Sequence, residues 1–354
     1  MLRFFKNPKI PFIEWRHYAY ILSLLLLVPG TASLLLKGGP RYGIDFTGGT
    51  LVQLRFEREV PLDKLRGRLA DVELGTFELE RFGDPREVVI RAKEQAGRAS
   101  ELAQRIEAAI RQDPELASNE FEVVRVDAVG PKIGSELQRK AILAIVYSWL
   151  FINLYVYFRF KGFKYGVTTV IALIHDSLVV IGVFSLLDKE ITLDVIAAIL
   201  TIIGYSVMDS IVVLDRIREK MRSRTRASLV ETIDRAINET LSRTVITSGL
   251  TLLVVLSLLF FGGRVIHDFA FALLVGIVAG SYSSIFVVAP LLVEWEAFMR
   301  KRRGGGGEVD SKGVASPAPA TPDGVSSSTE REKSPQPAGR ASRAQRRSRS
   351  RRGR

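Results

Sequence analysis

The chain has 354 residues, a formal net charge of +12 and no cysteine. Without cysteine, disulfides and thiolate metal sites are excluded. The positive charge would fit a nucleic-acid partner, but the basic residues concentrate beside apolar segments and in the tail, where anionic lipid is the expected partner. The mean hydropathy of +0.15 is low for a membrane protein because two polar stretches, residues 37–140 and the tail from residue 304, dilute the apolar runs.

Six runs of the sequence are long and apolar enough to cross a bilayer as helices, for which about 20 residues are needed. They are residues 18–36, 141–158, 165–187, 191–214, 244–261 and 269–293. The first two are marginal, and Pro29 followed by Gly30 is expected to kink the first helix. Residues 18–36 lack a small-residue cleavage site, so we expect this run to stay as an anchor. We therefore predict an α-helical membrane protein with six transmembrane helices.

Lysine and arginine gather in the short loops on one side of these runs. The short loops on the other side hold only Lys189 and Arg264. By the positive-inside rule, both termini are then cytoplasmic and the segment between the first two helices is translocated. The predicted organisation is a cytoplasmic N-terminus (1–17), a first helix (18–36), a translocated domain with its linkers (37–140), five helices with basic cytoplasmic loops (141–299) and a disordered basic cytoplasmic tail (300–354).

Residues 37–140 have the pattern of a small α+β domain. Alternating apolar residues predict strands, a 3.6-residue period predicts helices, and Gly83, Asp84 and Pro85 mark a turn. The predicted order is a strand at 50–57, a helix opening at Pro61, strands at 74–82 and 87–92, a helix at 99–111 and a strand at 121–129. This β-α-β-β-α-β order is that of a ferredoxin-like domain. The segment has no histidine, and we expect no catalysis there.

The tail from residue 304 is predicted to be disordered. It is rich in Ser, Pro, Gly and Ala, has no aromatic residue and ends in an arginine-rich run at 346–352. We expect a solvated segment held near anionic lipid headgroups. Contact with RNA is the weaker alternative, because charge would attract RNA but no aromatic side chain is present for stacking.

Asp209 is the most informative residue of the membrane part, because it lies within the apolar run 191–214. An ionisable side chain at the centre of a bilayer costs at least ~2.5–3.5 kcal/mol on insertion scales. A carboxyl lowers this cost by taking up a proton or by facing a cation, and Arg243, which precedes the next run, is the candidate cation. Asp215, at the polar border, lies about 9 Å further along a helix, so Asp209 is expected in the cytoplasmic half.

We interpret Asp209 and Arg243 as a proton-coupling site. Ser206, one turn before Asp209, and Thr247, one turn after Arg243, are predicted to support it with polar contacts. The alternatives are a fixed ion pair between helices, or an Arg243 side chain that snorkels to the interface.

His175 and Asp176 form a second polar pair, near the middle of the third run. They are candidates for a proton relay, or equally for a buried polar clasp between helices. Gly276 and Gly280 have the spacing of a helix-packing motif. The amphipathic stretch 229–241 is predicted to be an interfacial helix on the cytoplasmic face.

Several motifs together resemble the SecD/SecF protein-translocase family of the resistance-nodulation-division superfamily. They are residues 43–49 (GIDFTGG), 129–137 (VGPKIGSEL), 204–206 with Asp209 and 215–219, 238–248 at the start of the fifth span, and 282–284 (YSS). The single six-span set is similar to the SecF member of the pair. Met208 departs from the family, which usually has Asn at this position, and the tail matches nothing in it.

The resemblance implies a subunit of the bacterial inner (cytoplasmic) membrane with a periplasmic ferredoxin-like domain. It implies that the protein uses the proton-motive force, with functional weight on the residues matching Asp209 and Arg243, to promote late polypeptide translocation. The implied partners are SecD, the SecYEG channel with YajC and SecA as further candidates, unfolded translocating polypeptide, and anionic lipid. We expect no enzymatic activity, cofactor, metal or specific nucleic acid. The alternatives are a half-transporter of the same superfamily that exports lipid or small molecules, and a non-transporting scaffold.

Overall fold

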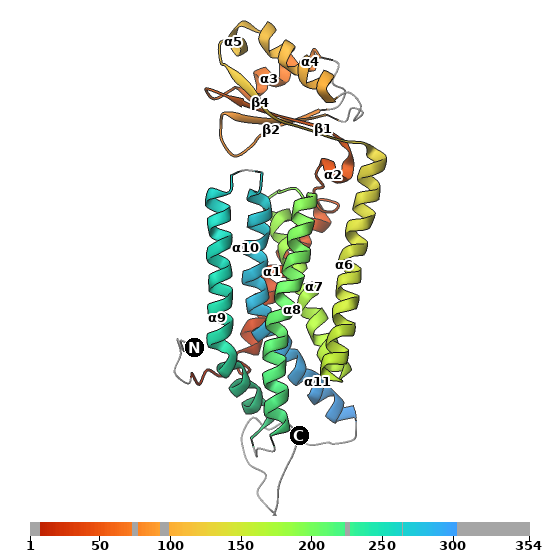
Figure 1. Ribbon diagram of the computed structural model, residues 1–354, viewed down its shortest axis with the longest axis vertical. Coiled ribbons are helices and arrows are strands. Elements are labelled where there is room, and N and C mark those ends of the chain that lie inside the picture. The colour runs from red at the N-terminus through yellow and green to blue at the C-terminus, as the bar shows by residue number, and fades with distance from the viewer. Residues whose placement is uncertain (1–7, 73–76, 93–98, 224–226, 264, 303–354) are drawn as a thin grey trace, which may run out of the picture. The chain divides into compact units, whose positions relative to one another are not determined.

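The computed structural model describes residues 8–72, 77–92, 99–223, 227–263 and 265–302. In this part of the chain, six helices are long and apolar enough to cross a membrane (Figure 1). They are α1 (Arg16–Leu36), α6 (Pro131–Phe160), α7 (Phe163–Leu186), α8 (Leu193–Arg222), α9 (Leu229–Phe261) and a sixth span made of α10 (His267–Ser283), a π-helical turn η2 (Ser284–Val288) and α11 (Ala289–Arg302). The predicted set of six spans is confirmed. The predicted tail from residue 304 lies outside the described residues.

The amphipathic stretch 229–241 is not a separate interfacial helix, and that prediction is wrong. It is the first part of α9, which begins at a capping box formed by Ser228 and Glu231 and continues without a break into the fifth span. No Pro or Gly interrupts the helix between the two segments. The apolar face, with Ile233 and Ile237, is buried in the protein rather than turned to lipid.

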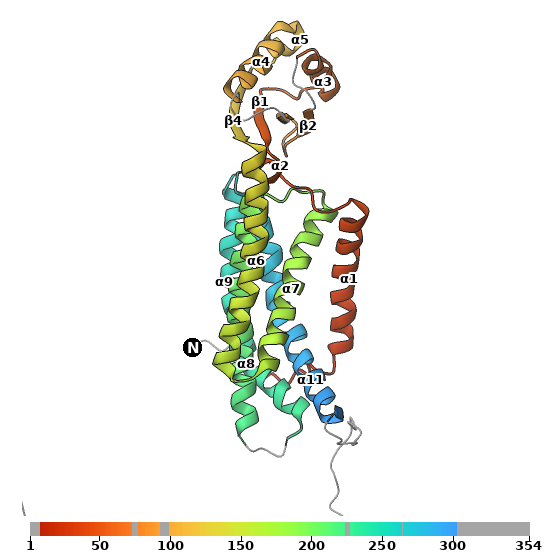
Figure 2. The same cartoon turned by 90° about the vertical axis from the view of Figure 1, so that its right-hand side faces the viewer.

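Helix α7 and the sixth span form the centre of the bundle. In each, 61 % of the apolar window is buried, against 11 % in α1, α6 and α9, so the latter three are peripheral. Figure 2 shows α7 between α1 and α6. Pro29 lies inside α1 without ending it, and a Cβ added at its neighbour Gly30 would lie 2.7 Å from the Cα of Gly182. The backbones of α1 and α7 therefore touch at two glycines.

Helices α8 and α10 pack closely through the predicted glycine motif. A Cβ at Gly276 would meet the side chain of Ile202 at 2.2 Å, and one at Gly280 would lie 3.1 Å from the Cβ of Ser206. Gly276 and Gly280 thus leave room for two residues one turn apart on α8, which confirms the packing prediction.

A four-stranded antiparallel sheet lies in the chain between α1 and α6. Its strands are β1 (Gly49–Phe56), β2 (Phe77–Arg81), β3 (Glu87–Ala92) and β4 (Phe121–Val129), in the order β2-β3-β1-β4. Helices α3 (Leu62–Ala70), α4 (Ala99–Gln112) and α5 (Pro114–Ala117) lie on one face (Figure 1). The ferredoxin-like prediction is confirmed. Residues 74–76 of the second predicted strand lie outside the described residues.

The core of this sheet domain follows from the alternation of apolar residues. Val52, Leu54 and Phe56 of β1 are at most 1 % exposed, and they pack with Leu65 of α3 and Ile106 of α4. The central strand β1 pairs with both β3 and β4, so its burial fixes the register of the whole sheet.

The GIDFTGG motif forms the joint between the sheet domain and the bundle. It folds into a short helix, α2 (Ile44–Thr47), which the sequence did not predict. Gly48, with φ +73°, approaches Pro131 at the start of α6 so closely that a Cβ would lie 2.7 Å from the proline Cα. The carboxylate of Asp45 accepts a hydrogen bond of 2.9 Å from the backbone N–H of Leu193, the first residue of α8. The motif therefore fixes the starts of α6 and α8.

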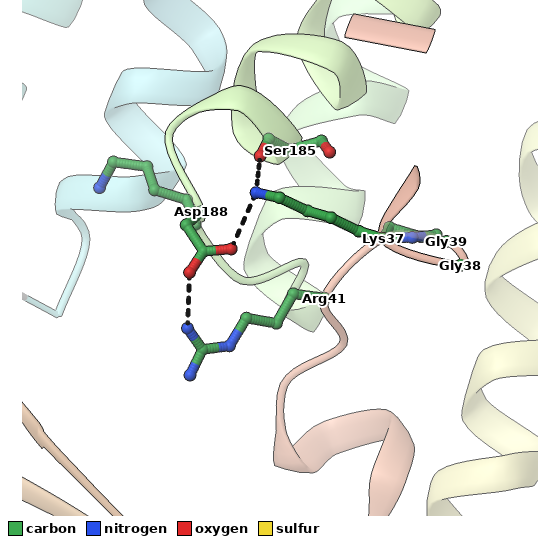
Figure 3. Close-up of a pocket in the computed structure, with 8 residues that line it drawn as sticks. Lys37, Gly38, Gly39, Arg41, Ser185 and Asp188 are labelled. Atoms are coloured by element: carbon green, nitrogen blue, oxygen red, sulfur yellow. Dashed lines mark hydrogen bonds and ion pairs between the residues drawn. The ribbon is translucent and has the colours of Figure 1, made fainter. Parts of the chain in front are cut away.

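Ion pairs also join the sheet domain to the α7–α8 connection. Arg91 of β3 lies 2.9 Å from Glu190 and 2.8 Å from Glu80 of β2. Arg41, which follows α1, pairs with Glu80 and lies 3.3 Å from Asp188 (Figure 3). The cleft in this figure has a volume of about 430 Å³ and is lined by both acidic and basic side chains. These pairs hold the joint from a second side.

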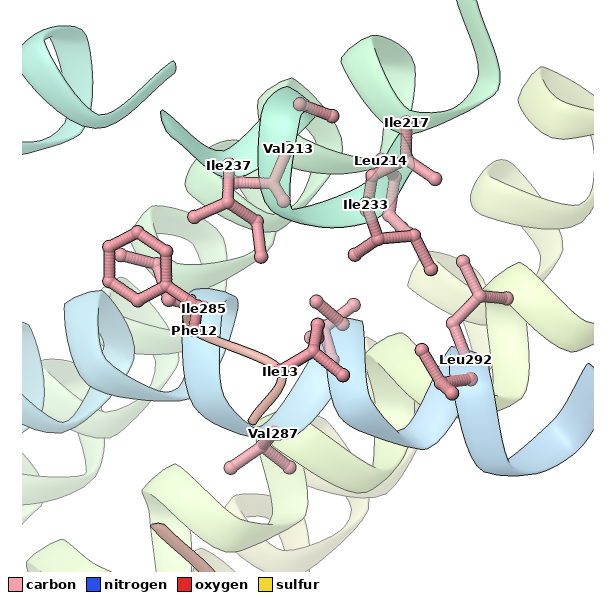
Figure 4. Close-up of a cluster of buried hydrophobic side chains, with 14 of the residues drawn as sticks. Phe12, Ile13, Val213, Leu214, Ile217, Ile233, Ile237, Ile285, Val287 and Leu292 are labelled. Carbon is pink, nitrogen blue, oxygen red and sulfur yellow. The ribbon is translucent and has the colours of Figure 1, made fainter. Parts of the chain in front are cut away.

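The N-terminal segment is bound to the last part of α8 and the first part of α9, at the end of the bundle away from the sheet domain. The side-chain amide of Asn238 accepts from the N–H of Ile10 and donates to its carbonyl, at 3.0 and 2.9 Å. Asp234 accepts from the N–H of Ile13 at 2.9 Å. Phe12 and Ile13 are thereby placed in a buried apolar cluster formed by α8, α9 and the sixth span (Figure 4).

Candidate functional site

Asp209, on α8, is held by hydroxyl groups from two other helices. Its Oδ1 accepts a hydrogen bond of 2.8 Å from Thr244 of α9, and its Oδ2 accepts one from Ser284 of η2. The side chain is partly buried. Each carboxylate oxygen therefore has a donor, which lowers the cost of a charge inside the span.

Arg243 does not contact Asp209 in this structure. No ion pair joins these two described residues, and the Arg243 side chain is exposed on α9. Successive residues of a helix are rotated by about 100°, so Thr244, rather than Arg243, faces Asp209. The two residues therefore form no ion pair in this structure, although the charge of Arg243 still acts on Asp209.

The two residues predicted to support the pair also lie elsewhere. Thr247 is exposed and donates to the backbone carbonyl of Arg243 at 3.0 Å, within its own helix. Ser206 is fully buried and donates to Asp176 at 2.6 Å rather than to Asp209. Ser206 therefore belongs to the second polar pair.

Asp176, on α7, is the most buried carboxyl of the bundle, with 1 % of its surface exposed. Its Oδ1 lies 3.0 Å from Nδ1 of His175, and its Oδ2 accepts from Ser206 of α8 and from Ser283 at 2.6 and 2.8 Å. His175 is also buried, its ring packs beside that of Tyr282, and its Nε2 has no hydrogen-bond partner among the described residues. Asp176 and His175 thus form a second polar centre that joins three helices.

Two consecutive serines link the two carboxyls. Ser283, the last residue of α10, bonds Asp176, and Ser284, the first residue of η2, bonds Asp209. Both serines are fully buried. A π-helical turn is rare and is frequent at functional sites, and this one begins where the chain touches both carboxyls.

The sequence did not single out Ser283, Ser284 or Thr244 as site residues. The first two appeared only as part of a family motif, and Thr244 only within the motif at the start of the fifth span, residues 238–248. The available signal was a cluster of hydroxyl residues in an apolar run, such as the YSS of residues 282–284, because a hydroxyl in lipid needs a partner.

Further hydroxyl contacts brace the helices around the two carboxyls. Ser248 of α9 accepts from Tyr205 of α8 at 3.1 Å and from Ser281 of α10 at 2.7 Å. The hydroxyl of Tyr282 donates to the carbonyl of Ala19 in α1 at 2.6 Å. Five of the six spans therefore take part in this connected polar layer.

Met208, the departure from the family pattern, points away from this layer. Its side chain is 63 % exposed on α8, and the partners of Asp209 come from α9 and η2 instead. The residue therefore does not alter the hydrogen bonds of Asp209 in this structure.

The fold and the polar site together define the class of protein. A six-span bundle that holds two hydroxyl-bound carboxyls, one buried and one partly buried, is a multi-pass membrane protein with an ionisable site inside the membrane, as proton-coupled proteins have. Within the described residues, no group of three or more His, Cys, Asp or Glu side chains could hold a metal ion. Hydroxyl groups and one imidazole are the partners of these carboxyls.

Two family descriptions match the sequence. "Protein export membrane protein SecD/SecF, C-terminal" matches residues 111–297, and "SecD/SecF GG Motif" matches residues 33–60. The chain belongs to the SecD/SecF family, and it is a multi-pass protein of the inner membrane. The second match contains the GIDFTGG joint described above.

Curated relatives match most of this chain. The protein translocase subunit SecF of Desulfurispirillum indicum is 43% identical over 292 residues, which are 81% of this chain and 91% of the relative. The corresponding protein of Vibrio alginolyticus is 40% identical, with 83% and 92% covered.

A solved structure has the same fold. SecDF from Thermus thermophilus, described as a translocon-associated membrane protein, is similar with a TM-score of 0.74 and 39% identity over 82% of this chain. This chain spans only 39% of the length of that protein. A SecDF structure in a super-membrane-facing form is similar with a TM-score of 0.62 and 37% identity.

Proposed function

We propose that the chain is an accessory subunit of the Sec protein-export machinery that uses the proton-motive force, with a SecD partner, to promote late polypeptide translocation. The observation that carries the proposal is Asp209, a carboxyl within a membrane span that hydroxyl donors hold in place. The relatives named as protein translocase subunits support the same reading. A half-transporter for lipid or small molecules has no observation in its favour.

We propose that both termini are cytoplasmic and that the sheet domain is periplasmic. The N-terminal segment contacts the start of α9, Arg159 pairs with Asp215 at 2.6 Å, and Lys164 pairs with Glu296. These contacts gather the N-terminal segment, the α6–α7 turn, the end of α8 and α11 at one end of the bundle. Most lysines and arginines of the short loops belong to this end, which the positive-inside rule assigns to the cytoplasm.

We propose that the exposed side of α8 and α9 is the contact face for SecD. Arg243, Thr247 and Met208 are exposed there, and a Cβ added at Gly204 would meet nothing within 4 Å. An arginine and a bare glycine surface are unfavourable against lipid and favourable against another helix. The unmatched length of the SecDF chain is consistent with a second subunit.

In the proposed cycle, Asp209 alternates between two sets of partners. An ionised carboxylate only accepts hydrogen bonds, whereas a protonated carboxyl also donates one. In the structure, hydroxyl groups rather than Arg243 bind Asp209. We assign this arrangement to the ionised state, because both carboxylate oxygens accept hydrogen bonds, and a changed set of partners to the protonated state. The change between the two would move α8 against α9 and thereby alter the contact with SecD.

The test is gradient-dependent export with a matched pair of variants on one helix. Asp209→Asn keeps the shape of the side chain but cannot titrate. Asp194→Asn removes the exposed carboxyl in the first turn of α8 and serves as the control. In vesicles that contain this chain, SecD and SecYEG, we expect Asp209→Asn to abolish the part of export that depends on the proton gradient, and Asp194→Asn to retain it. Normal export by Asp209→Asn would contradict the proposal.

A further inference from the structure

Ser283 and Ser284 each have two acceptors within reach of one hydroxyl group. Ser283 Oγ lies 2.8 Å from Asp176 Oδ2 and 3.2 Å from the carbonyl oxygen of Gly280. Ser284 Oγ contacts Asp209 Oδ2 and lies 3.1 Å from the carbonyl oxygen of Ser281. A serine hydroxyl carries a single proton, so each serine fully satisfies only one of its two acceptors at a time.

The charge of each aspartate decides which acceptor its serine uses. An ionised aspartate accepts a hydrogen bond from the serine hydroxyl. A protonated aspartate can donate its own proton to the serine oxygen, and the serine hydroxyl is then free to turn to the backbone carbonyl one turn earlier. The protonation state of the carboxyl thus determines whether the serine hydroxyl donates a hydrogen bond to a backbone carbonyl in the last turn of α10.

The two serines act on the same turn of the sixth span. They are consecutive in the chain, and the carbonyls of Gly280 and Ser281 are also consecutive. The carbonyl of Gly280 already accepts the backbone N–H of Ser284, so it is shared between the backbone of one serine and the hydroxyl of the other. A change in the protonation of one aspartate therefore alters the hydrogen bonds open to the serine that contacts the other aspartate.

Among the described residues, few other charged or titratable groups lie beside these two carboxyls. Asp176 faces His175 of its own helix, with Ser206 from α8 and Tyr282 beside the histidine ring. Asp209 faces Thr244 of α9, and Arg243 is the cation in the same segment. The path from Asp209 through Ser284 and Ser283 to Asp176 is formed of groups that are all hydrogen-bonded to one another or adjacent in the chain.

We propose that Ser283 and Ser284 are positioning residues that couple the protonation of Asp176 to that of Asp209, so that the two carboxyls titrate as one unit. This inference rests on the proposed proton-coupled function, and it adds a second carboxyl and the element that connects it. A purely structural role, in which the serines only clasp the helices, would leave the two titrations independent.

The test measures carboxyl protonation directly, on the full chain in lipid vesicles. Infrared spectroscopy follows the C=O band of each protonated carboxyl against pH, with Asp176→Asn and Asp209→Asn used to assign the bands. In the otherwise unchanged chain, we expect Asp209→Asn to move the titration midpoint of Asp176 by about one pH unit or more. If the titration midpoint of Asp176 is the same with and without Asp209→Asn, the proposal is wrong, and no serine variant is needed to show it.

Serine variants then locate the coupling. With Ser283→Ala and Ser284→Ala combined, we expect the effect of Asp209→Asn on Asp176 to disappear, whereas Ser281→Ala leaves it unchanged because Ser281 bonds Ser248 and its own helix. Ser284→Thr, with Ser283 intact, keeps the hydroxyl and should retain the coupling. Persistence of the coupling in the double alanine variant would overturn the proposal. Export is not read in this experiment, so loss of the export role of Asp209 would leave its outcome untouched.

Discussion

Asp209 is stabilised by hydroxyl donors that the bundle supplies from two directions. Thr244 approaches from α9 and Ser284 from the sixth span, so the carboxyl senses the position of both. A hydrogen bond to a charged group contributes about 1.5–3 kcal/mol, and loss of either donor therefore changes the balance between the two protonation states.

Removal of the Thr244 hydroxyl is the sharpest test at this scale. Thr244→Val keeps the branched shape and leaves Oδ1 of Asp209 without its donor. The ionised form loses stabilisation, so we expect the pH profile of gradient-dependent export to move toward higher pH by about one unit. Thr247→Val is the matched control, because Thr247 is exposed and donates only within its own helix. Equal profiles for the two variants would show that Thr244 has no special role.

The site shows where sequence reasoning reaches its limit. Asp209 was predicted because a carboxyl within an apolar run has a large free-energy cost in a bilayer, which indicates a function. Its hydrogen bond from Thr244 was missed because Arg243 and Thr244 are neighbours in sequence but point in directions about 100° apart, and the sequence does not fix the rotation of α9. Ser283 and Ser284 were missed because a serine hydroxyl costs much less free energy in a membrane helix than a carboxyl does, so its presence alone does not indicate a site.

At the scale of elements, the packing of α10 on α8 positions the second carboxyl. Gly280 lies against Ser206, and Ser206 donates to Asp176 at 2.6 Å. The spacing of the two glycines predicted this contact, but it could not indicate which helix would be the partner. The six spans and the strands were predictable for a different reason: each has a length or period that water and lipid impose on the chain.

Substitution of Gly280 should disturb both packing and the polar centre. In Gly280→Ala, the new Cβ would lie 3.1 Å from the Cβ of Ser206 and 3.2 Å from its Oγ. We expect the free energy of unfolding to fall by about 1–3 kcal/mol, measured by thermal unfolding of the purified chain in detergent. Gly204→Ala on the exposed side of α8 is the control, because its Cβ meets nothing within 4 Å. A Gly280→Ala chain as stable as Gly204→Ala would contradict this packing account.

At the scale of the whole molecule, ion pairs connect the sheet domain to the end of the bundle. Two arginines, Arg41 and Arg91, each contact Glu80 and Glu190. Burial alone would raise the pKa of Glu80, but hydrogen bonds from Arg41 and Arg91 outweigh it and hold the pKa below its ordinary value. Burial raises the pKa of Glu190, and the same two arginines offset only part of this effect.

The two glutamates therefore have opposite effects on the contact as pH changes. The stabilisation from Glu80 is present above its ordinary pKa and is lost as pH falls through its lowered pKa. The contribution of Glu190 is full below its ordinary pKa and is lost as pH rises through its raised pKa. At neutral pH we expect Glu80→Gln to loosen the contact and Glu190→Gln to leave it unchanged or tighter.

This prediction is measured as a distance between two spin labels. The chain has no cysteine, so Asp63→Cys on α3 and Leu187→Cys at the end of α7, both exposed, provide unique attachment points. We expect the distance distribution to broaden in Glu80→Gln and to match the parent in Glu190→Gln. The reverse order would contradict the assignment of the two glutamates.

The central claim is that Asp209 couples proton movement to the work of this chain. The most direct measurement is proton uptake into vesicles that contain the chain with SecD, after a pH gradient is imposed. We expect a flux in the parent protein that Asp209→Asn abolishes and Asp194→Asn retains. A flux that is absent from the parent, or that persists unchanged in Asp209→Asn, would contradict it and would favour a scaffold.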